Sequence, residues 1–362
     1  MSALHLRGTA LPDGQRVELW LVDGRVTYER PAAGAEVVTV AEGWILPGMV
    51  DAHCHIGLDA GGAIDEQTQE RQALDERAAG VLLARDCGVP SDTRWIDDRT
   101  DLPRIIRAGR HVASPKRYIR NFGVEVQPEL LVPTVIEQAQ RGDGWVKIVG
   151  DWIDREVGDL APCWPTEDLA RAVAAAHEAG ARVTTHVFGE DGVAQAAEVG
   201  MDCIEHATGL SGELVGVLAE RQIAIVPTLI NIANFPTIAA QADRFPAYAR
   251  HMMRLHDGVE AMVAVAHEAG IPIYAGTDAG GALEHGRITD EIQALIAAGM
   301  PARDAIGAAS WRARGWLGFG DPLAEGAPAE GVDVVILDAD PFEQPAVLAH
   351  PQCVVLRGAV VA

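Results

Sequence analysis

The sequence predicts an α/β protein, a (β/α)8 TIM barrel with a small β-sandwich domain formed by both chain termini. Three observations predict it. Short apolar runs alternate with helical patterns through the middle of the chain, both ends resemble strands joined by turns, and ligand-type residues recur where the middle strands end. Alternating strands and helices are typical of βα units. We expect residues 1–48 plus 325–362 to form the sandwich and residues 49–324 to form the barrel.

Eight strands are expected in the barrel, separated by amphipathic helices. The predicted strands are Met49–Ile56, Gly80–Cys87, Arg110–Ala113, Trp145–Val149, Arg182–Val187, Asp202–His206, Ile223–Leu229 and Pro272–Thr277. The clearest helical patterns are Glu167–Ala179, Glu213–Glu220 and Val259–Ala269. In two of these helices a His-Glu-Ala-Gly sequence leads into the glycine that ends the helix. We therefore interpret His177 and His267 as structural residues.

Both ends of the chain contain short apolar runs separated by turn residues, a pattern typical of a β-sheet. The expected strands are Leu4–Gly8, Arg16–Val22, Arg25–Tyr28, Val332–Leu337 and Cys353–Leu356. Asp-Gly pairs at residues 13–14 and 23–24 are typical hairpin turns. Because both ends show the same strand-and-turn pattern, we predict one small domain built from both ends.

Composition excludes several classes of partner. The 362 residues include 48% hydrophobic side chains and carry a net charge of −23. Such an acidic surface repels nucleic acid and anionic lipid, and no leader or membrane-spanning stretch is visible. The five scattered cysteines form no Cys-x-x-Cys pair, which favours reduced thiols in a cytoplasmic enzyme. The expected partner is a small-molecule substrate, and a homo-oligomer is among the assemblies that the sequence allows.

The first barrel strand carries a His-x-His pattern. It reads VDAHCHIG, with His53 and His55 two residues apart. Side chains alternate along a strand, so both imidazoles lie on one face. Two histidines at the C-terminal end of a barrel strand suit a divalent ion. Alone, the pattern is a weak indication.

Other strand ends strengthen this indication. Lys147 lies inside GWVKIVG, and TTHVFG, IEHATG and YAGTDAG contribute His186, His206 and Asp278. A buried lysine is costly unless it is neutralised or paired, and as a carbamate it would become a carboxylate that bridges two ions. Singly, Lys147 could reach an acidic partner and His206 could be a core histidine. Together, the six residues predict a two-metal site that activates water, with zinc as the default metal.

The chain resembles the amidohydrolase superfamily, specifically the branch with imidazolonepropionase-like enzymes and the Xaa-Pro and Xaa-Arg dipeptidases. The resemblance begins at WILPGMVDAHCHIG and covers nearly the whole chain. It continues through GVLLARDCG, VKIVG, THVFGEDGVAQAAEVGMDCIEHATGL, VPTL, GTDAG and the tail GVDVVILDADPF. It implies a composite β-sandwich and a (β/α)8 barrel.

The resemblance also implies roles for the six residues. His53 and His55 would bind the more buried metal together with Asp278. Carbamylated Lys147 would bridge to a second metal held by His186 and His206. Asp278 would also be the general base that takes a proton from a metal-bridging hydroxide and passes it to the leaving group.

The substrate segments depart from the dipeptidase pattern. That branch usually has a glycine-rich His segment after the third strand and a Tyr shortly after VPTL, whereas this chain has ASPKRYIRNFG and Ile232. Both losses argue against dipeptide hydrolysis. The first segment instead belongs to a basic cluster made of Arg104, Arg107, Arg110, Lys116, Arg117 and Arg120.

We expect one or two of the residues after the third strand to bind an anionic group of the substrate. The candidates there are Lys116, Arg117, Tyr118 and Arg120. The alternative is a solvated loop paired with nearby acids. His285, in a His-Gly pair like that of the family, is either a pocket residue or an ordinary loop histidine. Residues 230–245 are expected to form a flexible lid.

The other histidines have no partners that the sequence identifies. They are His5, His111, His251, His256 and His350.

Three functions remain in view. The leading hypothesis is a binuclear hydrolase that opens an amide, lactam, ester or similar bond of a small molecule, with an anionic substrate as one expectation. The second is a mononuclear deaminase or imidazolone-type ring-opening enzyme with Lys147 unmodified. The third is a non-catalytic scaffold, which is disfavoured because such proteins lose ligands and this chain lacks none.

Overall fold

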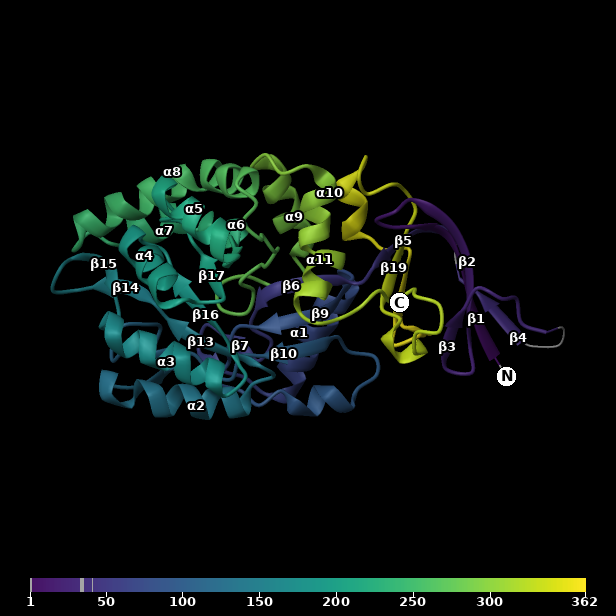
Figure 1. Cartoon of the computed structure of the whole chain (residues 1–362), viewed down its shortest axis with the longest axis horizontal. Helices are drawn as coiled ribbons and strands as arrows, with labels where there is room; N and C mark the ends of the chain where they lie inside the picture. The colour runs from purple at the N-terminus through teal and green to yellow at the C-terminus, as the bar shows by residue number, and fades with distance from the viewer. Residues whose placement is uncertain (1, 33–35, 41) are drawn as a thin grey trace.

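Strands from both ends of the chain share one sheet at one end of the molecule (Figure 1). The computed structural model describes residues 2–32, 36–40 and 42–362. In this sheet β5 (Gly43–Pro47) pairs parallel with β1 (Ser2–Ala10) and antiparallel with β19 (Val334–Leu337). The remaining strands are β2 (Gln15–Val22), β3 (Arg25–Thr27), β4 (Glu36–Thr39), β20 (Cys353–Leu356) and β21 (Ala359–Val360).

The hairpin between β2 and β3 turns where the sequence predicts it. Asp23 and Gly24 have φ angles of 50° and 77°. Positive φ at both central residues is the geometry of the two-residue turn that matches the strand twist. Alternate side chains on these strands, such as Leu19 and Leu21, pack with Ile45 and Ile336 in a separate small core.

Parallel strands run through the middle of the chain. One ladder joins β6 (Met49–Cys54), β9 (Val81–Asp86) and β10 (Arg104–Arg107). The other joins β12 (Val124–Glu125), β11 (Val112–Ala113), β13 (Trp145–Val149), β16 (Arg182–Val187), β17 (Cys203–His206) and β18 (Ala224–Val226).

The extended segment 272–279 lies between the first and last of these strands. Tyr274 donates its backbone N–H to Ile225 of β18, and Ala52 of β6 donates to Ala275. Isolated bridges rather than a continuous ladder make these connections, so the eighth predicted strand forms no regular strand. The arrangement is a TIM-barrel-type fold with mixed α/β content.

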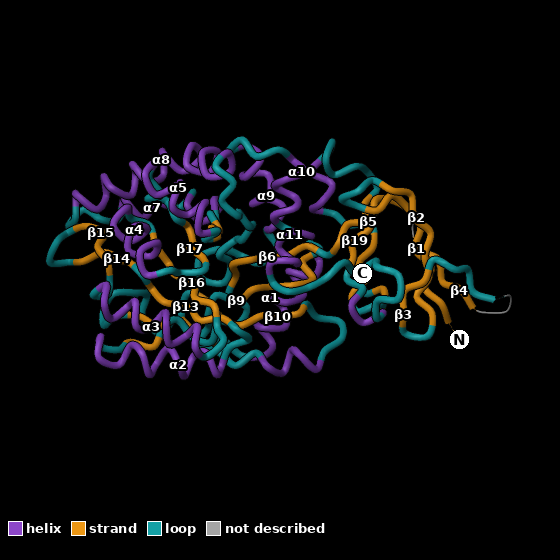
Figure 2. The backbone as a smooth tube through the Cα atoms, viewed as in Figure 1, coloured by secondary structure: helices purple, strands orange, loops and turns teal. Residues whose placement is uncertain are grey.

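Helices flank the parallel strands on the outside (Figure 2). They are α1 (Glu66–Ala78), α2 (Leu131–Arg141), α3 (Thr166–Glu178), α4 (Glu190–Val199), α5 (Gly212–Arg221), α6 (Leu229–Ile232), α7 (Phe235–Ala240), α8 (Pro246–Glu268), α9 (Ile288–Ala297), α10 (Ala302–Ala308) and α11 (Trp311–Trp316). In α3 the buried residues Leu169, Ala172, Val173 and Ala176 follow helical spacing and face the core.

Short elements complete the chain. Two small hairpins are formed by β7 (Leu58–Asp59) with β8 (Gly62–Ala63) and by β14 (Asp151–Asp154) with β15 (Asp159–Pro162). The 3-10 turns are η1 (Arg94–Asp98), η2 (Pro128–Leu130), η3 (Ala329–Gly331) and η4 (Pro345–Ala349).

The third predicted strand is confirmed in part, and a further strand precedes it. We expected Arg110–Ala113, but β10 covers Arg104–Arg107 and pairs with β9, whereas β11 covers only Val112–Ala113. The basic residues of the RIIR segment hide its strand character in the sequence. Arg107 is nevertheless buried, because its guanidinium binds Asp97 and Asp143.

Residues 230–245 are largely helical rather than a loop. They contain most of α6 and all of α7, and Ile232 and Phe235 are fully buried. The expected loop is therefore wrong, because apolar side chains of this segment pack into the main core. The predicted lid role stays a prediction. The helix predicted at Val259–Ala269 is the second half of the longer α8.

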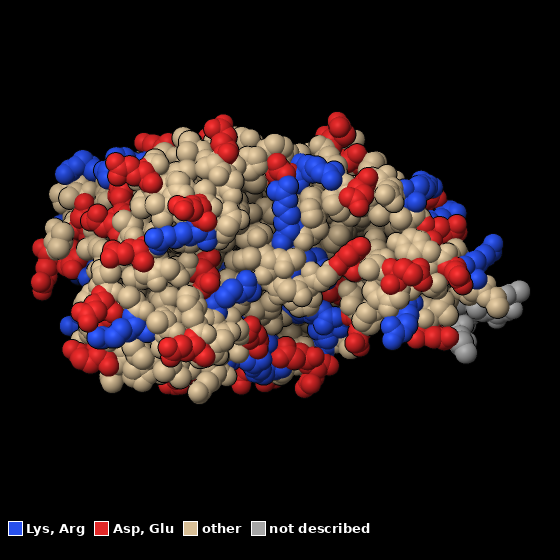
Figure 3. Space-filling model, in the orientation of Figure 1, with Lys and Arg blue, Asp and Glu red and all other residues tan. Residues whose placement is uncertain are grey.

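The surface carries interspersed acidic and basic side chains over the face shown in Figure 3. His177 and His267 lie at helix ends and bind Asp202 and Asp304, at 2.8 and 3.1 Å, in agreement with a structural role. In the described part of the chain, no helix combines the length and the apolarity that a bilayer crossing requires.

Candidate metal centre

A β-bulge turns both histidines of the first strand toward the inside of the parallel strands. The register between β6 and β9 shifts between Asp51 and Cys54. Ala52 packs in the interior cluster, so strict alternation would direct His53 away from it. The bulge lets His53 follow Ala52 inward, where its ring lies 5.1 Å from that of His55.

Left-handed backbone conformations aim two more side chains into the same space. His206 has a φ of 67° and Asp278 a φ of 60°. Non-glycine residues adopt this conformation at a cost and often do so at functional sites. At the end of β17, where Glu205 already faces the interior, the turn brings the His206 ring to within 5.3 Å of His53.

Three donor atoms converge on the β6 side of the site. Asp278 Oδ1 lies 3.2 Å from His53 Nε2 and 3.0 Å from His55 Nε2, and the two Nε2 atoms are 3.3 Å apart. Roughly 2.0–2.1 Å bonds to a tetrahedral zinc ion separate neighbouring donors by about 3.3 Å. The described side chains therefore fit a divalent ion.

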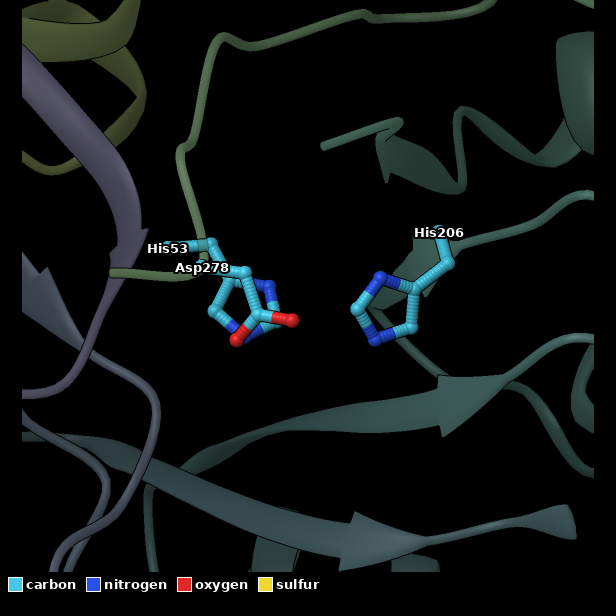
Figure 4. Close-up of side chains that lie close together, drawn as sticks. All are labelled: His53, His206 and Asp278. Carbon is cyan, nitrogen blue, oxygen red and sulfur yellow. The ribbon is translucent and has the colours of Figure 1, made fainter. Parts of the chain in front are cut away.

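A second pair of donors lies opposite. His186 Nδ1 and His206 Nε2 are 3.0 Å apart, and His206 Nδ1 is held by Thr228 Oγ1 at 2.7 Å. In Figure 4, His53 and Asp278 lie together and His206 faces them across a gap. His53, His206 and Asp278 can also place one ligand atom each within 4.8 Å of one another.

The protonation states suit metal binding. Burial lowers the pKa of His55, lowers that of His206 to about 3, and lowers those of His111 and His186 well below the usual value. Burial alone would raise the pKa of Asp278, but His53 and His55 hold it well below its usual range. Neutral imidazoles and an ionised carboxylate are the forms that ligate metals.

Lys147 is buried beside these residues. It is 1% exposed on β13, two residues before the position that pairs with His186. Its positive charge contributes to the lowered pKa of His55 and His186. The carboxylates of this region, within the described residues, pair with His53, His55 or Arg85 rather than with Lys147.

A buried ion pair lies behind His53. Glu205 Oε2 is 2.8 Å from His53 Nδ1, and Glu205 Oε1 is 2.7 Å from Arg85 Nη2. Burial would raise the pKa of Glu205, but Arg85, then His53 and Lys147, hold it well below its usual range. Sequence reasoning missed both residues. An arginine inside the apolar run VLLARD was a signal, because such a residue needs a buried partner.

His111 is a third residue whose place at the site the sequence did not predict. Its ring stacks on His55 at 5.1 Å and lies 5.1 Å from Tyr118. It is 1% exposed, and neither ring nitrogen has a hydrogen-bond partner among the described residues. No local pattern in the sequence links His111 to His55, because His55 follows a different strand, β6.

Asn231 reaches the site from α6. Its side-chain amide donates a 2.6 Å hydrogen bond to Asp278 Oδ2. Glu291 of α9 accepts the backbone N–H groups of Leu229 and Ile230 and so holds the start of this short helix. The sequence carries no local signal for this contact.

The predicted substrate residues lie in different places. Tyr118 is the one beside the site, with its ring 5.4 Å from that of His186. Arg117 binds Asp154 and the carbonyl groups of Trp152 and Ala161, so it fastens the β14–β15 hairpin. Lys116 and Arg120 are exposed.

His285 and the other basic residues are already engaged. His285 Nδ1 lies 2.8 Å from Glu76 Oε1 on α1. Arg104 binds Asp333, and Arg110 donates to the Phe122 carbonyl. The structure therefore brings together the six strand-end residues and Tyr118, but not the basic cluster.

These observations define a class: a TIM-barrel-type fold with histidines, a carboxylate and a lysine gathered at the C-terminal ends of its strands. The model of the amidohydrolase family matches residues 44–361, so the chain belongs to that family. This confirms the resemblance noted in the sequence. Family membership and the donor groups support a metal-dependent hydrolase with a small-molecule substrate.

Particular relatives span the whole chain. An uncharacterised protein of Mycobacterium tuberculosis (strain ATCC 25618 / H37Rv) is 54% identical over 356 residues, 98% of this chain and 95% of that protein. The crystal structure of a Xaa-Pro dipeptidase with bound methionine matches with a TM-score of 0.80, 22% identity and 99% coverage of both chains. The crystal structure of A. niger ochratoxinase matches with a TM-score of 0.78 and 19% identity, and the match covers 99% of this chain and 95% of that chain. Both structural matches show the shared fold.

Proposed function

We propose that this protein is a binuclear metal-dependent hydrolase that cleaves an amide, lactam, ester or similar bond of a small molecule. The observation that carries the proposal is the pair of facing donor sets. His53, His55 and Asp278 form one, and His186 and His206 form the other, with Lys147 buried beside them. The proposed frame is a closed (β/α)8 barrel of residues 49–324 with a β-sandwich of residues 1–48 and 325–362.

Lys147 is the proposed bridge between the two ions. A lysine that is 1% exposed needs a partner or a modification that removes its positive charge, and a carbamate on its amine would do so. The amine nitrogen would attack CO2, form a C–N bond and release one proton, which leaves a carbamate with two oxygens. Zinc is the proposed metal, since the ligands are nitrogen and oxygen atoms.

Two bound divalent ions would supply an activated water and polarise the scissile carbonyl group. Asp278 would accept the proton of that water and deliver it to the leaving group. Its Oδ1 faces the two histidines and its Oδ2 receives Asn231, so Oδ2 is the oxygen that remains available for the proton.

The aromatic side chains would shape the substrate pocket. Tyr118 lies against His111, Trp152 and His186, so these rings surround the donor atoms on the side of the β14–β15 hairpin. We propose Tyr118 and His111 as substrate contacts. We further propose that Lys116, Arg117 or Arg120 binds an anionic group of the substrate. A pocket role for His285 is also proposed. The Xaa-Pro dipeptidase match favours C–N bonds as the first to test.

The five cysteines are free and buried, which suits the proposed cytoplasmic location.

The test combines metal analysis with a hydrolysis screen. Protein loaded with zinc or manganese is expected to hold near two ions per chain and to hydrolyse members of a panel of N-acyl amino acids, dipeptides, cyclic amides and lactones. In the Lys147→Ala variant, added short carboxylic acids should restore part of the metal content and activity. Loaded protein with confirmed metal that cleaves no member of the panel would contradict the proposal.

One observation favours a mononuclear deaminase or ring-opening hydrolase as second candidate. His53, His206 and Asp278 can share a single ion, because their ligand atoms lie within 4.8 Å of one another. A content near one ion per chain, unaffected by Lys147→Ala, would support this second function.

A further inference from the structure

Glu205 is a buried carboxylate that lies between Arg85 and the proposed metal ligand His53. It lies on β17, is 0% exposed and directly precedes His206. Its two oxygens face different partners, with Oε1 2.7 Å from Arg85 Nη2 and Oε2 2.8 Å from His53 Nδ1. The proposed hydrolytic steps use neither Glu205 nor Arg85.

Arg85 holds Glu205 in this orientation. Its side chain is 0% exposed, and its Nε donates to the Ala52 carbonyl at 2.7 Å. The guanidinium lies 4.6 Å from the centre of the Trp145 ring and 4.9 Å from that of Trp316. A planar cation packed against two aromatic rings has little freedom to move, so the carboxylate oxygen that it binds is also fixed.

The neighbours of Glu205 leave Oε2 for His53. The Thr184 hydroxyl donates to Oε1, and the thiols of Cys87 and Cys203 lie 3.8 and 3.5 Å from that same oxygen. Oε1 is thus engaged, whereas Oε2 accepts no hydrogen bond from the described residues and lies 2.8 Å from His53 Nδ1.

We infer that Glu205 is a positioning residue that keeps the His53 proton on Nδ1 and turns Nε2 toward the metal. His53 Nδ1 and Glu205 Oε2 are 2.8 Å apart without the alignment of a hydrogen bond. A small rotation of the ring would let Nδ1–H donate to the carboxylate, which leaves the lone pair on Nε2, the nitrogen that lies 3.2 Å from Asp278 Oδ1. Arg85 acts through Glu205. The inference rests on the proposed metal centre and adds Glu205 and Arg85 as the residues that orient one of its ligands.

Glu205→Gln is the decisive variant because it reverses the polarity of the contact. The amide oxygen of Gln would face Arg85, so its NH2 would face His53 Nδ1. His53 would then carry its proton on Nε2, which cannot bind a metal in that state. We expect zinc and cobalt affinity, measured by competition with a chromophoric chelator, to fall about 10- to 100-fold.

Asp333→Asn is the matched control. Asp333 is also a fully buried carboxylate, and Arg314 is its buried arginine partner, at 3.4 Å. Asp333 lies at the contact between the terminal sheet and α11, so its loss should lower stability without changing metal affinity. Equal losses of affinity in Glu205→Gln and Asp333→Asn would overturn the inference, because the effect would then be one of folding.

A measurement on the wild-type protein needs no folded variant. Long-range proton–nitrogen spectra of metal-free protein with ¹⁵N-labelled histidine report the tautomer of His53, assigned with His53→Gln. The Nδ1–H form supports the inference and the Nε2–H form overturns it. Wild-type protein that binds no metal would contradict the proposed function. Wild-type and Glu205→Gln proteins that bind metal equally well would overturn only the role of Glu205.

Discussion

His111 carries an energetic cost that the other described residues do not relieve. Both ring nitrogens are buried, and neither has a partner among the described residues. An unpaired buried polar group costs roughly 1–3 kcal/mol. Such costs are common where a substrate or ion supplies the missing partner. His111 lies between His55 and Tyr118, next to the proposed metal centre.

Replacing His111 by Phe should separate stability from activity. The ring would keep its stacking contacts but lose both unpaired nitrogens, so the free energy of unfolding should stay equal or rise by about 1 kcal/mol. The kcat/KM for the substrate found in the screen should fall about tenfold or more, as expected when a hydrogen bond to the substrate is lost. Urea denaturation and steady-state kinetics measure the two effects. Unchanged kcat/KM would show that His111 does not contact substrate.

Asn231 offers a second residue-scale prediction. Its amide holds Asp278 Oδ2 at 2.6 Å, and a hydrogen bond to a charged group contributes roughly 1.5–3 kcal/mol. Asn231→Ala should therefore lower kcat about tenfold, with the metal content unchanged because Oδ1 faces the histidines. Asn231→Asp should lower kcat further, since it sets a like charge against Asp278. An Ala variant with wild-type kcat would contradict this role.

At the scale of elements, α6 depends on a carboxylate from another helix. Four residues are too few for a helix to be stable by itself. The Glu291 carboxylate accepts the N–H groups of Leu229 and Ile230 at 2.9 and 3.0 Å, near the helix N-terminus where negative charge is favoured. Burial nevertheless raises the pKa of Glu291 to about 7.

This shift predicts a pH-dependent stability. Because the folded pKa lies above the unfolded value, Glu291 contributes stability at low pH that is lost as pH rises toward 7. Glu291→Gln removes this titration, so the stability of the wild type relative to the variant should fall by about 2 kcal/mol between pH 5.5 and 8. Urea denaturation across this range measures the difference, with the exposed Glu330→Gln as control. A difference that does not vary with pH would contradict the prediction.

At the scale of the whole molecule, Asp333 connects the terminal sheet to the parallel strands. Its carboxylate lies 3.2 Å from Arg104 Nε on β10 and 3.4 Å from Arg314 Nη2 on α11, and it accepts the backbone N–H of Arg357 beyond β20. Three segments far apart in sequence thus meet at one buried carboxylate, which makes the sheet and the parallel strands a continuous structure.

Asp333→Asn should weaken this connection. Breaking a buried ion pair from one side costs about 3–5 kcal/mol, because a buried arginine is left without its counter-charge. We expect that loss in urea denaturation, with the metal affinity unchanged. If the variant unfolded with the wild-type midpoint, Asp333 would not hold the two parts together.

Many strands and turns were predictable because short stretches of sequence specify them. The boundaries of β13, β16 and β20 agree with the apolar runs in the sequence, and the Asp23-Gly24 turn follows from its residue types. The strand at Arg104–Arg107 was not predicted because Arg107 is buried through contacts with Asp97 and Asp143, which a local pattern cannot show. Residues 230–245 were misread as a loop for a related reason, since their helices are stabilised by packing and by Glu291.

The sequence by itself determined the set of strand-end residues, since period-two alternation and strand order place His53, His55, Lys147, His186, His206 and Asp278 at one end of parallel strands. That they bind metal stays a prediction. Only the tertiary structure decided how they are aimed and supported. The β6 bulge, the left-handed backbone of His206 and Asp278, and the contacts of Glu205 with Arg85 and of Asn231 with Asp278 join residues from separate strands and helices. Their energies depend on burial and distance, which chain order does not encode locally.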